Sequence, residues 1–201
     1  MEAARVVIAG AESTGKTTLA KDLQKYYRKL GGDFAKTQWV PEYGRDYTIK
    51  LIQQQGLYEE DPEAEVRSAE WQPEDFAIIA REQQRMEDEA AQSGSPLMIA
   101  DTDALATQLW ERRYLGAASH AAKDAVPDIP PRALWLLADY RDVPFVQDGI
   151  RDGENYRADM TRWFEEAIEA RGEPWHLVSG NRNERLNTSI RLIDAMLAAR
   201  S

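Results

Sequence analysis

The sequence has 201 residues, of which 43% are hydrophobic and 30% are charged, which suits one compact domain and excludes a disordered chain. It contains no cysteine, which excludes disulfides and thiolate metal sites, and no apolar run approaches the ~20 residues of a membrane span. The net charge of −10 comes without a basic stripe, so we expect no nucleic-acid or membrane partner and a cytoplasmic location.

A short apolar run, Arg5–Ala9, predicts a buried strand, and the next eight residues, 10–17, read G-A-E-S-T-G-K-T. This string fits the phosphate-binding pattern G-x-x-x-x-G-K-[S/T], in which glycines let backbone N–H groups approach phosphates. We expect Lys16 to neutralise phosphate charge, and Thr17 to bind Mg²⁺ at the start of a helix that ends at Gly31. The predicted nucleotide-binding residues here are Gly10, Glu12, Ser13, Thr14, Gly15, Lys16, Thr17 and Thr18.

A second strand is predicted over Phe34–Val40, followed by P-E-Y-G-R-D-Y at residues 41–47. Ligands of open α/β sheets bind beyond the carboxyl ends of the strands, so Glu42 would lie near the transferred phosphate and accept a hydroxyl proton. Tyr43 and Tyr47 would stack on a ring of the ligand. The alternative is a turn that leads into a helix with solvated charges.

Residues 54–74 are acidic and poor in apolar side chains, and we expect them to form a mobile excursion before a helix near Phe76–Ala91. A third strand, Pro96–Ala100, ends at Asp101-Thr102-Asp103. An Asp that ends a buried strand beside a phosphate loop is placed to hold Mg²⁺, so we favour Asp101 as a metal ligand. The alternative is a cap for the helix that follows, which ends before Gly116.

A fourth strand, Ala133–Ala138, precedes residues 139–157, which carry Arg141, Arg151 and Arg157. We expect this segment to be a lid whose arginines stabilise the charge on the transferring group. The alternative is a surface loop with ordinary ion pairs, which contribute little.

The last predicted elements are a helix that ends before Gly172, a fifth strand over Trp175–Val178 and a closing amphipathic helix. We expect His176 to be packed within its strand and His120 to be exposed. The tryptophans at strand positions are expected in the core: Trp39, Trp135 and Trp175. Strands that alternate with helices predict an α/β fold whose five-stranded parallel sheet is covered on both faces.

Four motifs follow one another along the chain: Gly10–Thr17, Glu42–Tyr47, Asp101–Asp103 and Asp148–Arg151. In this set the chain resembles the ribosylnicotinamide kinase domain of NadR-type proteins. The resemblance implies a single three-layer P-loop kinase domain over residues 1–201, with a lid at about 139–157. It also implies ATP-dependent phosphorylation of nicotinamide riboside to nicotinamide mononucleotide in NAD salvage.

The resemblance implies roles for individual residues. Lys16, Thr17 and Asp101 would serve nucleotide and metal, and Arg151 and Arg157 would act from the lid. The residues implied to face the riboside are Glu42, Tyr43, Arg45, Tyr47 and Asp103. Nicotinamide riboside carries a positive ring, which carboxylates attract and to which tyrosine faces add roughly 0.5–2 kcal/mol.

Two alternatives stay open. One is another nucleoside or small-molecule kinase, and the other is a nucleotide-dependent switch that binds partners. The guanine-reading N-K-x-D of small GTPases is absent, and the nearest string is Asn181-Arg182-Asn183-Glu184. The sequence also lacks the H-x-G-H signature of the nucleotidyltransferase domain in full-length family members, so adenylylation and gene regulation are not expected. The acceptor, the choice between ATP and GTP, and the oligomeric state stay open.

Overall fold

The computed structural model describes residues 2–56, 69–141, 143–146 and 153–200. All five strands run parallel in one sheet, in the order β2-β3-β1-β4-β5, and this confirms the predicted α/β fold. The strands are β1 (Ala4–Ala9), β2 (Gln38–Val40), β3 (Leu97–Asp101), β4 (Leu134–Ala138) and β5 (Trp175–Val178).

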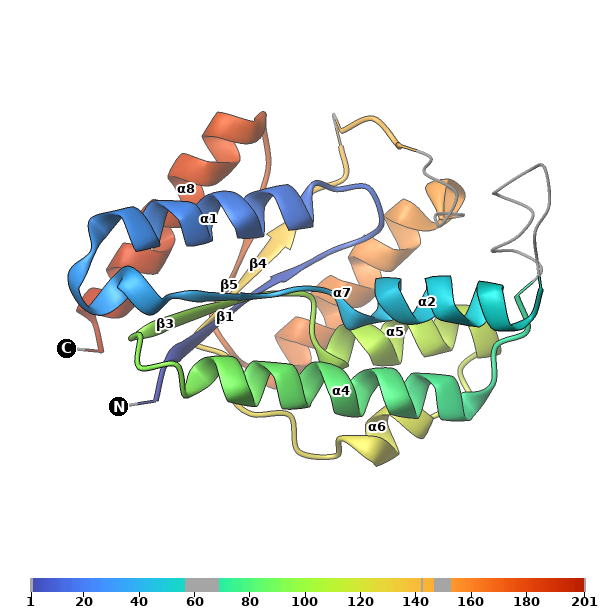
Figure 1. Ribbon diagram of the computed structural model, residues 1–201. Helices are drawn as coiled ribbons and strands as arrows, with labels where there is room; N and C mark the ends of the chain where they lie inside the picture. The colour runs from blue at the N-terminus through green and yellow to red at the C-terminus, as the bar shows by residue number, and fades with distance from the viewer. Residues whose placement is uncertain (1, 57–68, 142, 147–152, 201) are drawn as a thin grey trace.

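Helices cover both faces of the sheet (Figure 1). They are α1 (Lys16–Leu30), η1 (Gly32–Lys36), α2 (Tyr43–Gln54), α4 (Pro73–Ala91), α5 (Ala104–Leu115), α6 (Ala121–Ala125), η2 (Glu154–Tyr156), α7 (Arg157–Arg171) and α8 (Arg182–Ala198). One apolar core lies between the sheet and α1 with α8, and another lies between the sheet and α4, α5 and α7. The chain termini lie at the opposite end of the sheet from the loop that joins β1 to α1 (Figure 1).

β1 occupies the centre of the sheet, where Val6 is level with Ile99 of β3 and with Leu134 of β4. Every residue of these three strands is buried. Burial on both faces explains why each strand reads as a continuous apolar run rather than as an alternating pattern.

The second strand is shorter than predicted. It begins at Gln38, because Gly31 and Gly32 take positive φ angles of 73° and 54° and turn the chain into η1. Phe34, which we assigned to the strand, lies in η1 instead, with its ring 5.4 Å from that of Tyr27. The apolar Phe34 side chain therefore packs against the core between the sheet and α1.

The edge strand β5 overturns another prediction. β5 pairs only with β4 among the described strands, and His176 is exposed rather than packed. Its neighbour Leu177 is 39% exposed. The core assignment is confirmed for Trp135, which is fully buried, whereas Trp39 and Trp175 are partly buried and pack against the two cores. His120 is exposed, as expected.

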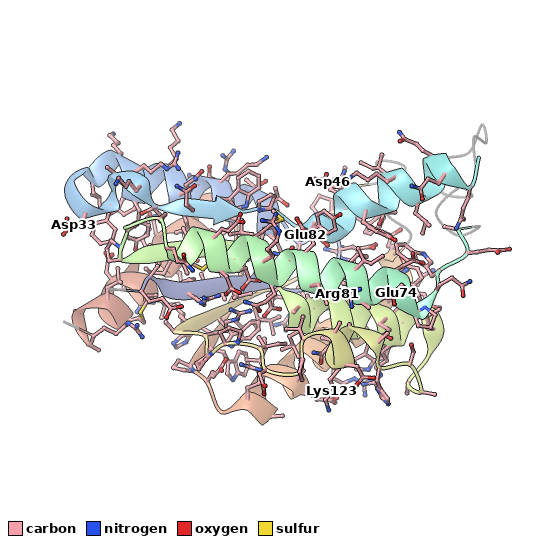
Figure 2. The ribbon with its side chains drawn as sticks, turned by 60° about the horizontal axis from the view of Figure 1, so that its bottom comes forward. Asp33, Asp46, Glu74, Arg81, Glu82 and Lys123 are labelled. Carbon is pink, nitrogen blue, oxygen red and sulfur yellow. The ribbon has the colours of Figure 1, made fainter. Side chains whose placement is uncertain are left out.

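The helix α4 is amphipathic and borders the site. Figure 2 shows Glu74 and Arg81 side by side on its outer side, where they form a 2.7 Å ion pair. Its inner side buries Phe76 and Ile79. Of the acidic residues 54–74, residues 57–68 lie outside the described part of the chain. No helix within the described residues is long and apolar enough to cross a membrane.

Candidate active site at the carboxyl ends of the strands

The phosphate loop, residues 10–17, joins the carboxyl end of β1 to α1. A Cβ on Gly10 would lie 2.9 Å from the Ala138 carbonyl oxygen, so only glycine fits against β4 there. Gly15 is the N-cap of α1 with φ 81°, a conformation that favours glycine. Lys16 is 7% exposed, and its Nζ donates to the Ala11 carbonyl at 2.7 Å. The loop can therefore bring backbone N–H groups, a helix N-terminus and one ammonium group to a phosphate.

The middle of the loop also contacts other segments. Glu12 accepts a hydrogen bond from the Gly153 N–H at 2.8 Å and pairs with Arg113 at 3.3 Å. The Ser13 hydroxyl accepts from the Val146 N–H at 2.7 Å. These contacts tie the loop to α5 and to the chain on either side of residues 147–152.

Asp101 ends β3, directly beside β1, and is 1% exposed. Burial raises the pKa of its carboxyl group, while the nearby Lys16 ammonium and a hydrogen bond from Thr17 lower it. Its Oδ1 has no hydrogen-bond partner within the described residues. A buried carboxylate with an unused oxygen beside a phosphate loop is suited to a cation.

Glu42 lies immediately before α2 and lines the main cavity together with Lys16 and Arg45. Burial raises its pKa to about 7, with further contributions from the negative charges of Asp101 and Glu12, which Lys16 and Arg45 partly offset. A carboxyl group with a pKa near 7 is well matched to accept a proton at neutral pH.

The tyrosines of α2 do not line this cavity. The Tyr47 hydroxyl donates a hydrogen bond to Asp75 at 2.7 Å. The centre of the Tyr43 ring lies 6.2 Å from that of the Tyr47 ring, and the Lys50 ammonium lies over the face of the Tyr43 ring. The α2 residues that line the cavity are Gly44, Arg45 and Thr48. The predicted stacking of both tyrosines on a ligand ring therefore conflicts with the geometry.

Asp103 does not line the cavity either. It caps α5 by accepting from the Ala106 N–H at 3.1 Å, and it pairs with Arg132 at 3.0 Å. Arg132 also pairs with Glu87 at 2.8 Å, and all three side chains of this network are buried. The predicted contact of Asp103 with the riboside conflicts with this arrangement, and the helix cap is Asp103 rather than Asp101.

An aromatic wall, which none of the sequence motifs indicated, lines the cavity instead. It consists of four side chains from α4, α5 and the residues before α4: Trp71, Phe76, Trp110 and Tyr114. The Trp71 ring lies 5.1 Å from the Phe76 ring and 5.2 Å from the Tyr114 ring. Trp110 and Tyr114 are four residues apart, which places them on one side of a helix. This spacing is the one sequence pattern that indicates an aromatic surface here.

A second cavity also borders the start of α1. It shares Thr14, Gly15 and Thr18 with the main cavity. Its remaining wall comes from Leu19, Val143, Pro144, Gly180, Asn181, Arg182 and Arg185. The Arg185 guanidinium donates to the Thr14 carbonyl at 2.9 Å and so fixes the loop between the two cavities.

The arginines of the predicted lid lie in different environments. Arg157 is 8% exposed and donates to the carbonyls of Val143, Tyr140 and Ser13. Arg141 pairs with Asp139 at 2.9 Å. Arg151 and the motif Asp148–Arg151 lie outside the described residues.

Comparisons with known proteins agree with this architecture. The model of a family described as an AAA domain matches residues 5–185. The chain is similar to two solved structures at 16% identity: NadR protein in complex with NR (TM-score 0.68) and NadR protein in complex with NAD and AMP-PNP (TM-score 0.67). The matches cover 97% and 98% of this chain but 51% and 50% of theirs, so the chain spans about half their length.

A thymidylate kinase from Ehrlichia chaffeensis is also similar, with a TM-score of 0.61 and 14% identity over 96% of this chain and 100% of that chain. No curated protein sequence matches the chain. The similarity confirms the P-loop kinase fold.

Proposed function

The chain belongs to the AAA domain family, matched over residues 5–185, and on that premise we propose that it is a nicotinamide riboside kinase. It would transfer the γ-phosphoryl group of ATP to the 5′-hydroxyl of the riboside and form nicotinamide mononucleotide. Residues 1–201 would act as one kinase domain, with 139–157 as its lid.

One observation carries the proposal. A single cavity brings Lys16 of the phosphate loop together with Glu42 and with the aromatic wall. Phosphoryl transfer needs charge stabilisation, a group that orients or deprotonates the attacking hydroxyl, and a fixed acceptor. Lys16, Glu42 and the aromatic wall would supply these three in that order.

The donor nucleotide would occupy the second cavity. Thr14, Gly15 and Thr18 line both cavities, so a triphosphate that follows the loop has its nucleoside end on one side and its γ-phosphate on the other. Lys16 and the N-terminus of α1 would hold the phosphates between them.

The residues present fit Mg²⁺. The Asp101 carboxylate has an unused oxygen within the described chain and accepts a hydrogen bond from Thr17. Carboxylate and hydroxyl oxygens are the ligands that Mg²⁺ takes beside phosphates. When bound, Mg²⁺ would neutralise negative charge on the phosphates of the nucleotide. Asp101 and Thr17 would hold it.

Asp101→Asn should lower kcat/KM by about 10²-fold, with part of the loss recovered at high Mg²⁺. The melting temperature should not fall, because burial already raises the Asp101 pKa and the neutral amide removes a costly buried charge. A Mg²⁺ titration of activity checks this, with Asp33→Asn as the matched control, since Asp33 is exposed in η1 (Figure 2) and does not line the cavity. A variant that titrates with Mg²⁺ like the wild type would remove Asp101 from the metal site.

Two carboxylates of the cavity would attract a cationic acceptor, while its other charged side chains, Lys16 and Arg45, would attract the phosphates of the donor. Glu12 and Glu42 both line the cavity, and their mutual repulsion contributes to the raised Glu42 pKa. A positive pyridinium ring would stabilise the ionised form of Glu42 and gain cation–π contact with the aromatic wall. A nucleoside monophosphate, as in thymidylate kinases, would bring a phosphate dianion toward the two carboxylates.

A coupled kinase assay over a panel of acceptors tests the proposal. We expect kcat/KM for nicotinamide riboside to exceed that for uridine, cytidine, deoxynucleosides and thymidine monophosphate by at least about tenfold, a difference of about 1.4 kcal/mol. Equal activity on ordinary nucleosides would contradict nicotinamide riboside as the substrate, while the proposal of a kinase activity would still hold. Slow ATP hydrolysis unaffected by every acceptor would favour the nucleotide-dependent switch.

A further inference from the structure

Arg113 of α5 stands where three parts of the candidate site meet. Its Nη1 lies 3.3 Å from Glu12 of the phosphate loop, and its side chain is 4% exposed. Its guanidinium lies over the rings of Trp110 and Tyr114 of the aromatic wall, at 5.5 and 4.8 Å, and over that of Tyr156, at 4.8 Å.

Gly153 completes this junction. Its N–H donates to the second Glu12 oxygen at 2.8 Å, so the Glu12 carboxylate joins α5 to the chain that enters α7. A Cβ on Gly153 would lie 2.4 Å from Glu12 Oε2 and 3.0 Å from Arg113 Nη1. The Gly153 φ of −99° suits any residue, so a Cβ there would act only by displacing the Glu12 carboxylate and the Arg113 guanidinium.

We propose that Arg113 is a positioning residue: it fixes Glu12 and thereby holds the phosphate loop, the aromatic wall and the Gly153–Tyr156 segment as one unit. The proposal rests on the kinase function above. It gives α5 two roles, because the helix that contacts the acceptor through Trp110 and Tyr114 also orients the loop that holds the donor phosphates.

The consequence for chemistry concerns water. In transfer, the bond between the γ-phosphorus and the bridging oxygen of ADP breaks as a bond to the acceptor oxygen forms, and the hydroxyl proton passes to a base. In hydrolysis, a water oxygen takes the acceptor's place and inorganic phosphate results. A loosened junction misplaces the acceptor relative to the phosphate and admits water, so it favours hydrolysis.

Two variants break the junction in different ways. Arg113→Lys keeps the charge but loses the planar contact with the three rings. Gly153→Ala removes no polar group and only fills the space beside Glu12. Each should lower the ratio of transfer to hydrolysis by about tenfold, and the double variant should lose little more than the worse single variant, because both disrupt one contact. Arg162→Lys, at an exposed surface ion pair, is the matched control.

Hydrogen exchange separates this proposal from the proposed function, since it needs no acceptor. The Gly153 amide should exchange at least about tenfold faster in Arg113→Lys than in the wild type. Equal exchange rates, a wild-type ratio in Gly153→Ala, or losses that multiply in the double variant would each overturn the positioning role. If the wild type phosphorylates no acceptor but the Gly153 amide still exchanges faster in Arg113→Lys than in the wild type, only the kinase function is overturned.

Discussion

Lys16→Ala is expected to lower kcat for phosphoryl transfer by about 10³-fold or more while the protein keeps its fold. The ammonium lies within the phosphate loop, where its charge would act on phosphate oxygens as negative charge shifts during transfer. Alanine cannot replace that charge, and the neighbouring carboxylates Asp101 and Glu42 would then face the phosphates without it.

The structural cost of this substitution is small. Within the described residues the Lys16 ammonium donates one hydrogen bond, to the Ala11 carbonyl, and loss of one such bond costs about 1 kcal/mol. Single-turnover kinetics checks the loss of transfer, and the melting temperature checks that the fold is kept. Lys25→Ala, on an exposed side of the same helix, should behave as wild type. Near-normal transfer by Lys16→Ala would refute the role of the loop.

Glu42→Gln should lower kcat by about 10²- to 10⁴-fold if Glu42 accepts the hydroxyl proton, because the proton moves only in the chemical step. If Glu42 instead acts as counter-charge to the pyridinium, the loss should fall mainly on KM. It should then be larger for nicotinamide riboside than for nicotinic acid riboside, whose carboxylate makes it neutral overall. Steady-state kinetics on both ribosides decides between the two roles.

The pH profile adds an independent test of the base. Because the Glu42 pKa is raised to about 7 in the ligand-free protein, protonation near neutral pH would remove the proposed base from part of the molecules. Wild-type kcat/KM should therefore rise with pH through about 7, and Glu42→Gln should lose that rise. Glu165→Gln, at an exposed position of α7, should keep it. A rise that survives in Glu42→Gln belongs to another group.

Much of the fold could be predicted because its determinants are local. Central strands buried on both faces appear as short apolar runs, and the helix stops at Gly31, Gly116 and Gly172 coincide with the observed ends of α1, α5 and α7. Strand order is not local. The position of β5 at the sheet edge exposes His176, which its apolar neighbours in the sequence suggested was packed.

The candidate site likewise contains residues that local sequence patterns indicate and residues that only long-range packing brings together. Lys16, Glu42 and Asp101 follow strand ends, and parallel strands bring their carboxyl ends to one edge of a sheet, so these three side chains lie close enough for their charges to interact. The aromatic wall depends on how α4 packs against α5, which no short motif encodes. The buried pair of Asp103 with Arg132 could not be predicted, because a long stretch of sequence separates the two residues.

The central place of β1 has a consequence for biosynthesis. β1 leaves the ribosome before both of its partners, β3 and β4, and Gly10 of the phosphate loop packs on Ala138 at the end of β4. Such long-range pairing is slow, because a large loop must close before any contact forms. A nascent chain would therefore carry the whole phosphate-binding motif yet lack a folded phosphate site until residue 138 has emerged, and during that interval its apolar first strand would depend on chaperones for protection from aggregation.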